Sequence, residues 1–462
     1  MAQPLAHTHA ANPHWLPAEQ GQDVLHIPGS DGLPVIGNTI AILSGPHEFA
    51  RRMVAKYGLV WRDRVFGARN VALFGPDANE LVLFDRDKLF SNEQGWGPTL
   101  NLLFPRGLML LDFERHRADR RVLAAAFKAE PMRHYAAVMN RGIAERLGEW
   151  VGRPIRFYDE IKKLTLDLAA EAFLGVELGA DAERLNRAFV DTVRAAVAPV
   201  RRPWFGSAMR AGVKGRQALV DYLLPQVAGR REGTGEDIFS RVCQATGEDG
   251  EPMPAAAIVD HMIFLMMAAH DTTTSSLTSL LYLLGETPDE VEPLEEEAAA
   301  LFTDVGDAPT PEQAERLGAA ERAFKETLRM VAPVPSVPRR ALRQFAFGGY
   351  DLPAGARVSV SPGWTHMDPE IWPEPTRFDP SRFLPDEVRG RHRFAWVPFG
   401  GGAHMCLGLH FAVLQARLFS FHLHRRYAVE PGWELGADWQ GRWIEWPIPK
   451  PRDGLPLTIR RR

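Results

Sequence analysis

The residues best suited to chemistry lie in one segment near the end of the chain, Phe399 to Ala412, which reads FGGGAHMCLGLHFA. Its three consecutive glycines let a backbone pass close to a flat, bulky group. Cys406 follows at the expected start of a helix, where free N–H groups and the helix dipole favour a thiolate. Gly408 leaves no side chain on that face. A thiolate so placed can bind haem iron and favour O–O cleavage; the alternative is a buried structural cysteine beside a glycine turn.

An acid and an alcohol stand side by side at Asp271 and Thr272, within the segment Ala255 to Leu284. That segment is apolar over most of its surface, so we expect a helix buried at the centre of the protein. A buried helix rarely carries an acid unless the acid is paired or functional. The two side chains offer a proton source and a holder for bound oxygen. The alternative is a polar helix face turned to solvent.

Two pairs of charged residues recur at helical spacing. His116 and Arg120 stand four positions apart and can present two donors to paired carboxylates, although solvated charge is the simpler interpretation. Glu326 and Arg329 stand three positions apart and can form an ion pair. By itself that pair is a weak signal, because exposed pairs of this kind contribute little.

The elements that must position these residues are mostly helices. We expect one large, mainly α domain with a smaller β region over 29–462, after a flexible polar lead over 1–28. Interruption by glycine and proline predicts a long apolar loop over Ser91 to Asp112. Other expected segments are short strands at 59–67 and 70–75, helices over 113–150 and 407–427, and the clearest β pattern over 332–365.

Composition excludes several classes of protein. Lys and Arg number 54 against 58 Asp and Glu, which gives no reason to expect nucleic acid as a partner. The only cysteines, Cys243 and Cys406, are far apart, which argues against a disulfide framework or a Cys-rich zinc site. We take Cys243 to be structural. No run of about 18 apolar residues occurs, so we expect no membrane span. Without a signal-peptide pattern at the start, we expect a soluble, cytoplasmic protein.

The cysteine segment resembles the signature of the cytochrome P450 family, F-x-x-G-x-R-x-C-x-G. Phe399, Gly402, Cys406 and Gly408 match it. His404 stands where the family usually has the arginine that holds a haem propionate. The resemblance implies that Cys406 is the axial iron ligand, and that Phe399, His404 and Gly408 contact the cofactor.

The central helix resembles the family's [A/G]-G-x-[D/E]-T motif. Ala268, Asp271 and Thr272 match, and Ala269 replaces the usual glycine. The resemblance implies that Asp271 and Thr272 help to deliver protons to bound oxygen. We prefer Thr272 to the threonines that follow it because it matches the motif.

The charged pairs also have counterparts in the family. The resemblance makes His116 and Arg120 propionate contacts, together with Arg339, to which the neighbouring Arg340 is the alternative. It makes Glu326 and Arg329 the structural E-x-x-R pair, joined by an arginine of the downstream loop. That arginine is either Arg377 or Arg382.

The resemblance covers the chain from about residue 27 onward and implies the cytochrome P450 fold, with haem b and a thiolate ligand. It implies an O2-dependent monooxygenase that hydroxylates a lipophilic, terpenoid-, retinoid- or sterol-like molecule. No flavin or nucleotide domain is visible, so we expect electrons to come from a separate partner. The resemblance to soluble bacterial members implies that this partner is a ferredoxin with its ferredoxin reductase, and we expect a monomer. Two alternatives remain: a peroxide-dependent or isomerising haem-thiolate enzyme, and a non-catalytic haem protein. The residues expected to form the substrate pocket are apolar: Trp96, Leu100, Leu103, Phe104, Phe264, Met267, Ala268, Val334 and Val337.

Overall fold

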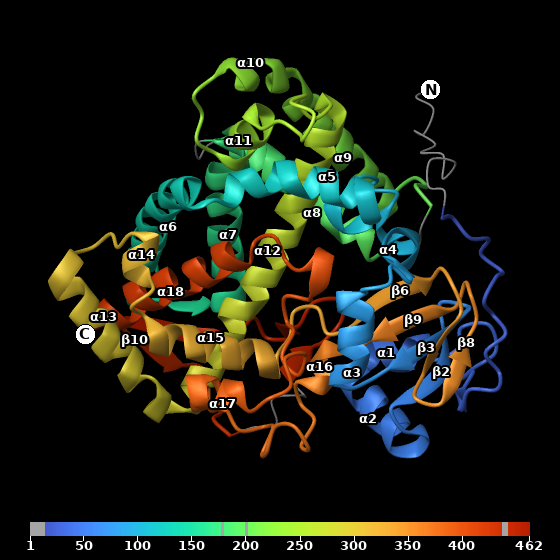
Figure 1. Ribbon diagram of the computed structural model, residues 1–462. Coiled ribbons are helices and arrows are strands. Elements are labelled where there is room, and N and C mark those ends of the chain that lie inside the picture. Colours follow the sequence, from blue (N-terminus) through green and yellow to red (C-terminus); the bar gives the residue numbers. More distant parts are fainter. Residues whose placement is uncertain (1–13, 177–179, 199–201, 437–441) are drawn as a thin grey trace.

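The computed structural model describes residues 14–176, 180–198, 202–436 and 442–462. Helices fill the left and top of Figure 1, a six-stranded sheet lies on the right, and helix α12 runs through the middle. The arrangement confirms the expected mainly α fold with a smaller β region. Among the described residues, none of the helices combines the length and the apolar character that crossing a bilayer requires.

The helices and strands have the following bounds. The helices are α1 Thr39–Ser44, α2 Pro46–Tyr57, α3 Pro76–Asn79, α4 Glu93–Leu100, α5 Phe113–Ala124, α6 Ala129–Trp150, α7 Phe157–Leu174, α8 Ala180–Ala196, α9 Ala208–Leu223, α10 Val227–Glu232, α11 Ile238–Gln244, α12 Ala255–Glu286, α13 Glu292–Val305, α14 Pro311–Ala314, α15 Gly318–Met330, α16 Pro362–Thr365, α17 Pro385–Arg389 and α18 Leu409–Arg426. The strands are β1 Gly29–Ser30, β2 Val60–Val65, β3 Ala68–Leu73, β4 Phe90–Ser91, β5 Pro154–Arg156, β6 Val337–Ala341, β7 Phe345–Phe347, β8 Tyr350–Leu352, β9 Arg357–Val360, β10 Tyr427–Pro431, β11 Trp443–Ile444, β12 Lys450–Pro451 and β13 Pro456–Arg461.

The large sheet joins strands from distant parts of the chain in the order β1-β2-β3-β9-β6-β4. Strands β2 and β3 form an antiparallel hairpin, and β9 lies parallel to β3. Strand β6 then pairs antiparallel with both β9 and β4. This topology brings β6, which carries Arg339, beside the segment that leads into α4.

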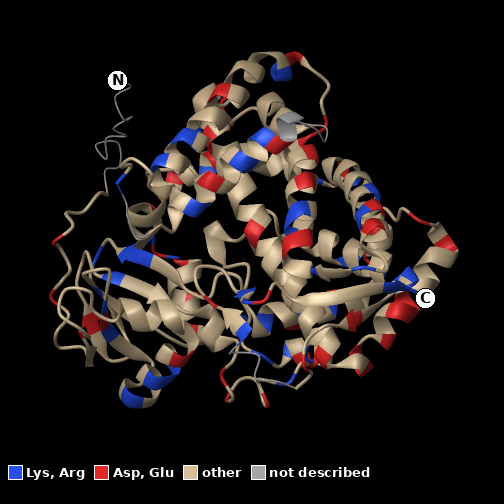
Figure 2. Cartoon of the chain, turned by 180° about the vertical axis from the view of Figure 1, so that it is seen from behind, with Lys and Arg blue, Asp and Glu red and all other residues tan. Residues whose placement is uncertain are grey.

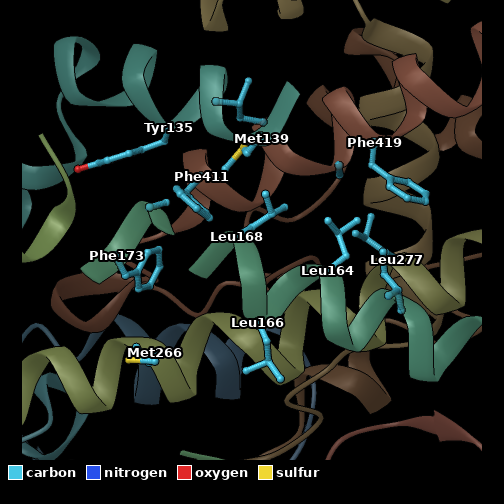
Figure 3. Packing of buried hydrophobic residues seen from close by; sticks show 14 of the residues in the cluster. Tyr135, Met139, Leu164, Leu166, Leu168, Phe173, Met266, Leu277, Phe411 and Phe419 are labelled. Carbon is cyan, nitrogen blue, oxygen red and sulfur yellow. The ribbon is translucent and has the colours of Figure 1, made fainter. Parts of the chain in front are cut away.

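The main core lies between α6, α7, α12 and α18. Tyr135, Phe173, Met266 and Phe411 come from these four helices and pack together in Figure 3. Helix α12 carries few charges and is buried along most of its length, because neighbouring helices surround it. Its burial fixes the place of the polar residues at its middle.

One expectation about local structure was wrong. The stretch from Ser91 to Asp112 is not a structureless loop, since α4 lies within it and includes Pro98. The polar lead makes contacts with the rest of the protein at several points after residue 13. Val24 and Ile27 are buried against the sheet, and the Gln94 side chain donates to the carbonyl of His14 at 2.9 Å. The rest of that lead, residues 1–13, lies outside the described residues.

Helices α8 and α9 pack as a tight antiparallel pair. A Cβ added to Gly212 on α9 would lie 2.2 Å from the Cβ of Ala195 on α8, and one added to Gly215 would lie 2.3 Å from the Ala188 carbonyl oxygen. Only glycine allows this separation. A nearly buried ion pair between Arg216 and Asp260 ties α9 to the central helix.

Candidate active site

Cys406 lies in a tight loop that leads into α18. Its N–H donates to the Phe399 carbonyl at 2.8 Å, which closes the glycine segment on itself. Gly402 has a φ of +61°, and a Cβ there would lie 2.4 Å from the Leu83 carbonyl oxygen. Glycine is therefore required here by backbone conformation and by packing on Leu83. Gly408 has no atom within 4 Å of its Cβ position, so the space beside the thiol is clear of protein.

The Cys406 side chain is accessible to solvent but sits in a recess, with protein around it. Burial raises the pKa of its thiol, although a hydrogen bond from the Gly408 N–H and the charge of Arg120 act in the opposite direction. Arg120 stands on α5, whose first turn begins after Asp112. The loop and α5 together place a donor and a cation near the sulfur, both of which favour a thiolate.

A cavity of about 1090 Å³ adjoins this loop. Phe399, Gly402 and Leu409 line it, and so do basic side chains from several separate parts of the chain. Among them are the residues predicted to contact haem carboxylates, which are His116 and Arg120 on α5, Arg339 on β6 and His404 in the cysteine loop. The structure therefore brings together the residues that the sequence predicts as contacts for haem carboxylates. His116 and His404, the most distant of them, are 288 positions apart in the chain.

The basic residues of the cavity crowd one another. The rings of His116 and His404 lie with centroids 3.8 Å apart and their planes tilted by 30°. Burial and the nearby Arg120 lower the pKa of His116 to about 4. Burial and His116 lower the pKa of His404 well below its usual range, and burial lowers the pKa of Arg339 to about 10. The lowered pKa values show that the charged forms of these residues are unfavourable here, so a bound anion would stabilise the cluster.

Protein carboxylates at the cavity are engaged elsewhere. Asp112 accepts from the Ser91 hydroxyl and the Asn92 N–H, and Glu114 pairs with Lys88 and Arg117. The buried Nε2 of His116 has no hydrogen-bond partner among the described residues. A flat group with two carboxylates would fit this donor set. Haem and its propionates meet that description.

The acid and alcohol of α12 lie on an accessible stretch at the middle of the helix. Ala268 is exposed and Asp271 and Thr272 are partly exposed, although most of the helix on either side is buried, so this stretch faces open space. The Thr272 hydroxyl donates to the Ala268 carbonyl at 2.8 Å. Thr272 is thus held beside that space, as a role at bound oxygen requires.

Asp271 is held by two basic neighbours. Lys162 Nζ on α7 lies 3.3 Å from its Oδ1, and His270 Nδ1 lies 3.0 Å from the same atom without hydrogen-bond alignment. Burial raises the pKa of Asp271, but the contacts with His270 and Lys162 outweigh it and lower the pKa to about 2. The carboxylate is therefore ionised at neutral pH and directed toward α7.

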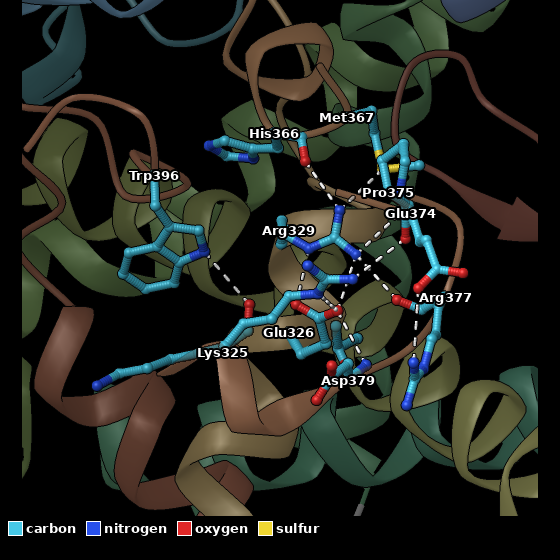
Figure 4. A network of polar contacts seen from close by, with 12 residues as sticks. Lys325, Glu326, Arg329, His366, Met367, Glu374, Pro375, Arg377, Asp379 and Trp396 are labelled. Atoms are coloured by element: carbon cyan, nitrogen blue, oxygen red, sulfur yellow. Dashed lines mark hydrogen bonds and ion pairs between the residues drawn. The ribbon is translucent and has the colours of Figure 1, made fainter. Parts of the chain in front are cut away.

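The E-x-x-R pair is fully buried behind the cysteine loop. Arg329 donates to Glu326 through Nε at 2.7 Å, and its other nitrogens donate to the carbonyls of His366 and Pro375 at 2.9 and 2.8 Å (Figure 4). The His366 ring in turn accepts from the Val397 N–H at 2.9 Å. The pair thus supports the backbone two residues before Phe399, which is a structural role.

Of the two arginines offered for this network, Arg382 is the one whose side chain joins it. Its Nε lies 3.4 Å from Glu326 Oε1. The Arg377 side chain instead pairs with Glu374 at the surface, and only its backbone carbonyl accepts from Arg329. Burial decides between them, since the Arg382 side chain is 11% exposed and that of Arg377 is 64% exposed.

The expected substrate wall divides into core and accessible residues. Leu103 and Phe104 are sealed in the core, where the Phe104 ring meets Phe264 edge-on at 6.3 Å. Leu100 is also buried. None of the nine residues lines the cavity beside the cysteine loop. The members that remain accessible are Trp96, Met267, Ala268, Val334 and Val337.

Several residues at the site were not found from the sequence. Lys162 is 109 positions from Asp271, and nothing local indicates their contact. His270 stands inside the recognised motif, where its ring could have been noted as a partner for the next residue. Trp396 also lines the cavity and precedes the cysteine signature directly.

Comparison with known proteins decides the family. The cytochrome P450 family model matches residues 27–434. The chain is 37% identical over 454 residues to the putative cytochrome P450 136 of Mycobacterium tuberculosis, covering 96% of this chain and 90% of that one. The chain belongs to the cytochrome P450 family. This cytochrome P450 also resembles the structure of retinoic acid-bound cyanobacterial CYP120A1, with a TM-score of 0.84, 26% identity, and coverage of 94% and 99%.

Membership fixes the class of chemistry. This cytochrome P450 is an oxidoreductase of the monooxygenase type that uses haem with a cysteine thiolate ligand and O2 as co-substrate. It is also 27% identical to the β-amyrin 28-monooxygenase of Kalopanax septemlobus, over 94% of this chain and 91% of that one. The sequence-based expectations of family, fold, enzyme class and cofactor are confirmed.

Proposed function

We propose that this cytochrome P450 hydroxylates a lipophilic, terpenoid-, retinoid- or sterol-like molecule, using electrons from a separate ferredoxin and ferredoxin reductase. The observation that carries the mechanism is the convergence of the loop before Cys406 and the four predicted basic residues on one cavity. The substrate class is supported by two relatives, one bound to retinoic acid and the other a β-amyrin 28-monooxygenase. The protein is further proposed to be a cytoplasmic monomer.

Haem held by a thiolate supplies the capacity to activate O2. Cys406 binds the iron, and His116, Arg120, Arg339 and His404 hold the two propionates. The protein's other task is proton delivery. Thr272 holds a proton at its hydroxyl beside the accessible stretch of α12, and the ionised Asp271 accepts the next proton from the side of α7 and passes it on.

Asp271 must change partners to act. In the described state its Oδ1 contacts Lys162 and His270. Release from Lys162 frees the carboxylate to exchange protons with Thr272 through water. Substrate binds against the accessible apolar residues Trp96, Met267, Val334 and Val337, which exclude water from the reacting centre.

The electron donor is proposed to dock at the mouth of the cavity. Arg393, Arg117 and Arg121 are exposed residues of its lining. Arg117 and Arg121 pair with Glu114 and Glu248, whereas the Arg393 guanidinium lies over the rings of Phe84 and Phe394. An acidic ferredoxin would meet positive charge close to Cys406. Arg393→Glu should raise the KM for ferredoxin several-fold and leave the CO spectrum unchanged.

The first test is the absorbance spectrum of the reduced, CO-bound protein beside a Cys406→Ser control. A red-shifted Soret band of the thiolate type, lost in the variant, supports the ligand assignment. An ordinary histidine-type spectrum would refute it.

The second test is a spin-state titration with retinoic acid, β-amyrin and a sterol, using a small aromatic molecule as the control. Tight binding of any of the three lipophilic ligands, followed by ferredoxin-dependent hydroxylation, supports the substrate class. A response to the small molecule alone would refute it.

A further inference from the structure

Large apolar side chains gather on the outside of the protein at one corner of the six-stranded sheet. They come from the segment before and within α1 and from the turn of the β2–β3 hairpin. We name this surface the apolar tip. Its residues and their exposed fractions are Leu33 56%, Val35 78%, Ile36 41%, Ile40 58% and Phe66 68%.

The two parts of the apolar tip form one surface because the backbone joins them. Gly37 forms a β-bridge with Val65, the residue before the hairpin turn. The Asn38 N–H donates to the Arg64 carbonyl at 2.7 Å, and the Phe66 N–H donates to the Thr39 hydroxyl at 2.8 Å. Segment and hairpin therefore hold their exposed side chains in fixed relative positions.

Val35, the most exposed residue of the tip, has a strained backbone. Its φ is +66°, and the Ile36 N–H donates to the Pro34 carbonyl at 2.8 Å across it. Three-residue turns with a positive central φ are rare, and a β-branched residue in this region is a true outlier. Strain of this kind persists only where the surrounding structure holds it in place, and it clusters at functional sites.

Phe66 repeats the pattern at the hairpin turn. Phe66 and Gly67 are the two turn residues, with φ of +48° and +81°, between the paired residues Val65 and Ala68. Two-residue turns with both φ positive favour Asn-Gly, since asparagine tolerates that conformation. A phenylalanine there is unfavourable for the fold and places a large ring in solvent.

Positive charge adjoins the apolar tip. Asp31 is shared by three arginines: Arg62 at 2.5 Å, Arg69 at 3.3 Å and Arg64 at 3.5 Å. One carboxylate for three guanidinium groups leaves two positive charges in excess. Arg64 and Arg69 face each other across the hairpin next to the turn.

The whole region is basic although the chain is acidic. Residues 29–70 contain six Lys or Arg and three Asp or Glu, a net charge of +3, in a chain with a net charge of −4. Blue residues mark the sheet and α2 on the left of Figure 2. An apolar surface with basic residues beside it is complementary to an anionic lipid bilayer, whose interior accepts apolar side chains and whose phosphates accept arginine.

We propose that the apolar tip docks this enzyme on an anionic membrane surface, with Val35 and Phe66 entering the lipid and Arg64 and Arg69 contacting phosphate headgroups. The attachment is peripheral and reversible. It brings the protein to the phase in which lipophilic molecules dissolve, and it stands independently of which molecule is oxidised.

The test is flotation of the full-length holoenzyme with phosphatidylcholine vesicles, with and without phosphatidylglycerol. The tip variant carries Val35→Asn and Phe66→Asn, and the control carries Leu384→Asn and Val388→Asn, which are exposed apolar residues near α17. We expect the tip variant to bind anionic vesicles about tenfold or more weakly, because two large side chains no longer enter lipid. The control should bind like the unmodified enzyme.

A second readout separates lost docking from lost folding. Asparagine relieves the positive φ at both positions, so the tip variant should melt at a higher temperature than the unmodified enzyme while binding lipid less. Arg64→Gln with Arg69→Gln should abolish the preference for phosphatidylglycerol and weaken the dependence of binding on salt.

Three results would overturn the proposal. The first is an unmodified holoenzyme that floats with neither type of vesicle. The second is a tip variant that floats as well as the unmodified enzyme. The third is a dimer of the unmodified enzyme that the tip variant disrupts while vesicle binding stays the same, since the tip would then be an interface between two copies.

Discussion

Replacing Arg329 by methionine should destabilise the protein far more than an ordinary core substitution. Both Arg329 and Glu326 have side chains that are 0% exposed, so the change leaves a carboxylate buried without its main partner. Breaking a buried ion pair in this way costs about 3–5 kcal/mol. The carbonyls of His366 and Pro375 also lose their donor, at about 1–3 kcal/mol each before water compensates. Against a total stability of about 5–15 kcal/mol, the variant should keep only a small margin and unfold at a much lower urea concentration.

The reasoning is tested by a double-mutant cycle. Glu326→Gln removes the charge but keeps an oxygen that can accept from the Asp379 N–H, which lies 3.0 Å away. The double variant with Arg329→Met should therefore be more stable than the sum of the two single costs predicts, by about 2 kcal/mol. Urea unfolding followed by circular dichroism measures all three variants. If the stability lost by the double variant equals the sum of the losses of the two single variants, the idea that an isolated buried charge causes the destabilisation is refuted.

Three further predictions concern single residues. Burial raises the pKa of Asp63 to about 7, so the stability contributed by this carboxyl is full below about pH 4 and falls as pH rises to 7. Asp63→Asn should thus raise the melting temperature at pH 8 but not at pH 4, and equal shifts at both would contradict the assignment. Asp271→Asn should lower ferredoxin-dependent turnover about 10²-fold with the CO spectrum intact, because an amide cannot relay the proton; unimpaired turnover would exclude the relay. Gly107→Ala places a Cβ 2.3 Å from the Phe264 ring and should cost about 1–3 kcal/mol in thermal unfolding, whereas Gly148→Ala, with no atom within 4 Å, should cost nothing.

The spacing of residues within a segment predicted the parts of the site that one continuous segment forms. His116 and Arg120 share a helix face because they are four positions apart, and both line the cavity. The central helix was predicted within two residues of its end, since its apolar character is continuous. The cysteine segment carries its own turn chemistry in its glycines.

Contacts between distant segments could not be predicted. Arg377 and Arg382 lie in one loop, and only the packing of that loop against α15 decides which side chain reaches Glu326. The lead before the first strand appeared flexible because it is polar, yet Val24 and Ile27 anchor it in the sheet core. Such anchoring depends on surfaces formed elsewhere in the chain.

The close packing of α8 on α9 has a kinetic consequence. Two helices locked by Gly212 and Gly215 cannot slide past each other, so they can only swing as one body, and the pair of Arg216 with Asp260 resists that swing. If ligands enter by this swing, the rate of the swing sets the upper limit of the ligand association rate. Small and large ligands should then reach the same maximum association rate at saturating concentration, and their affinities should differ only through their dissociation rates.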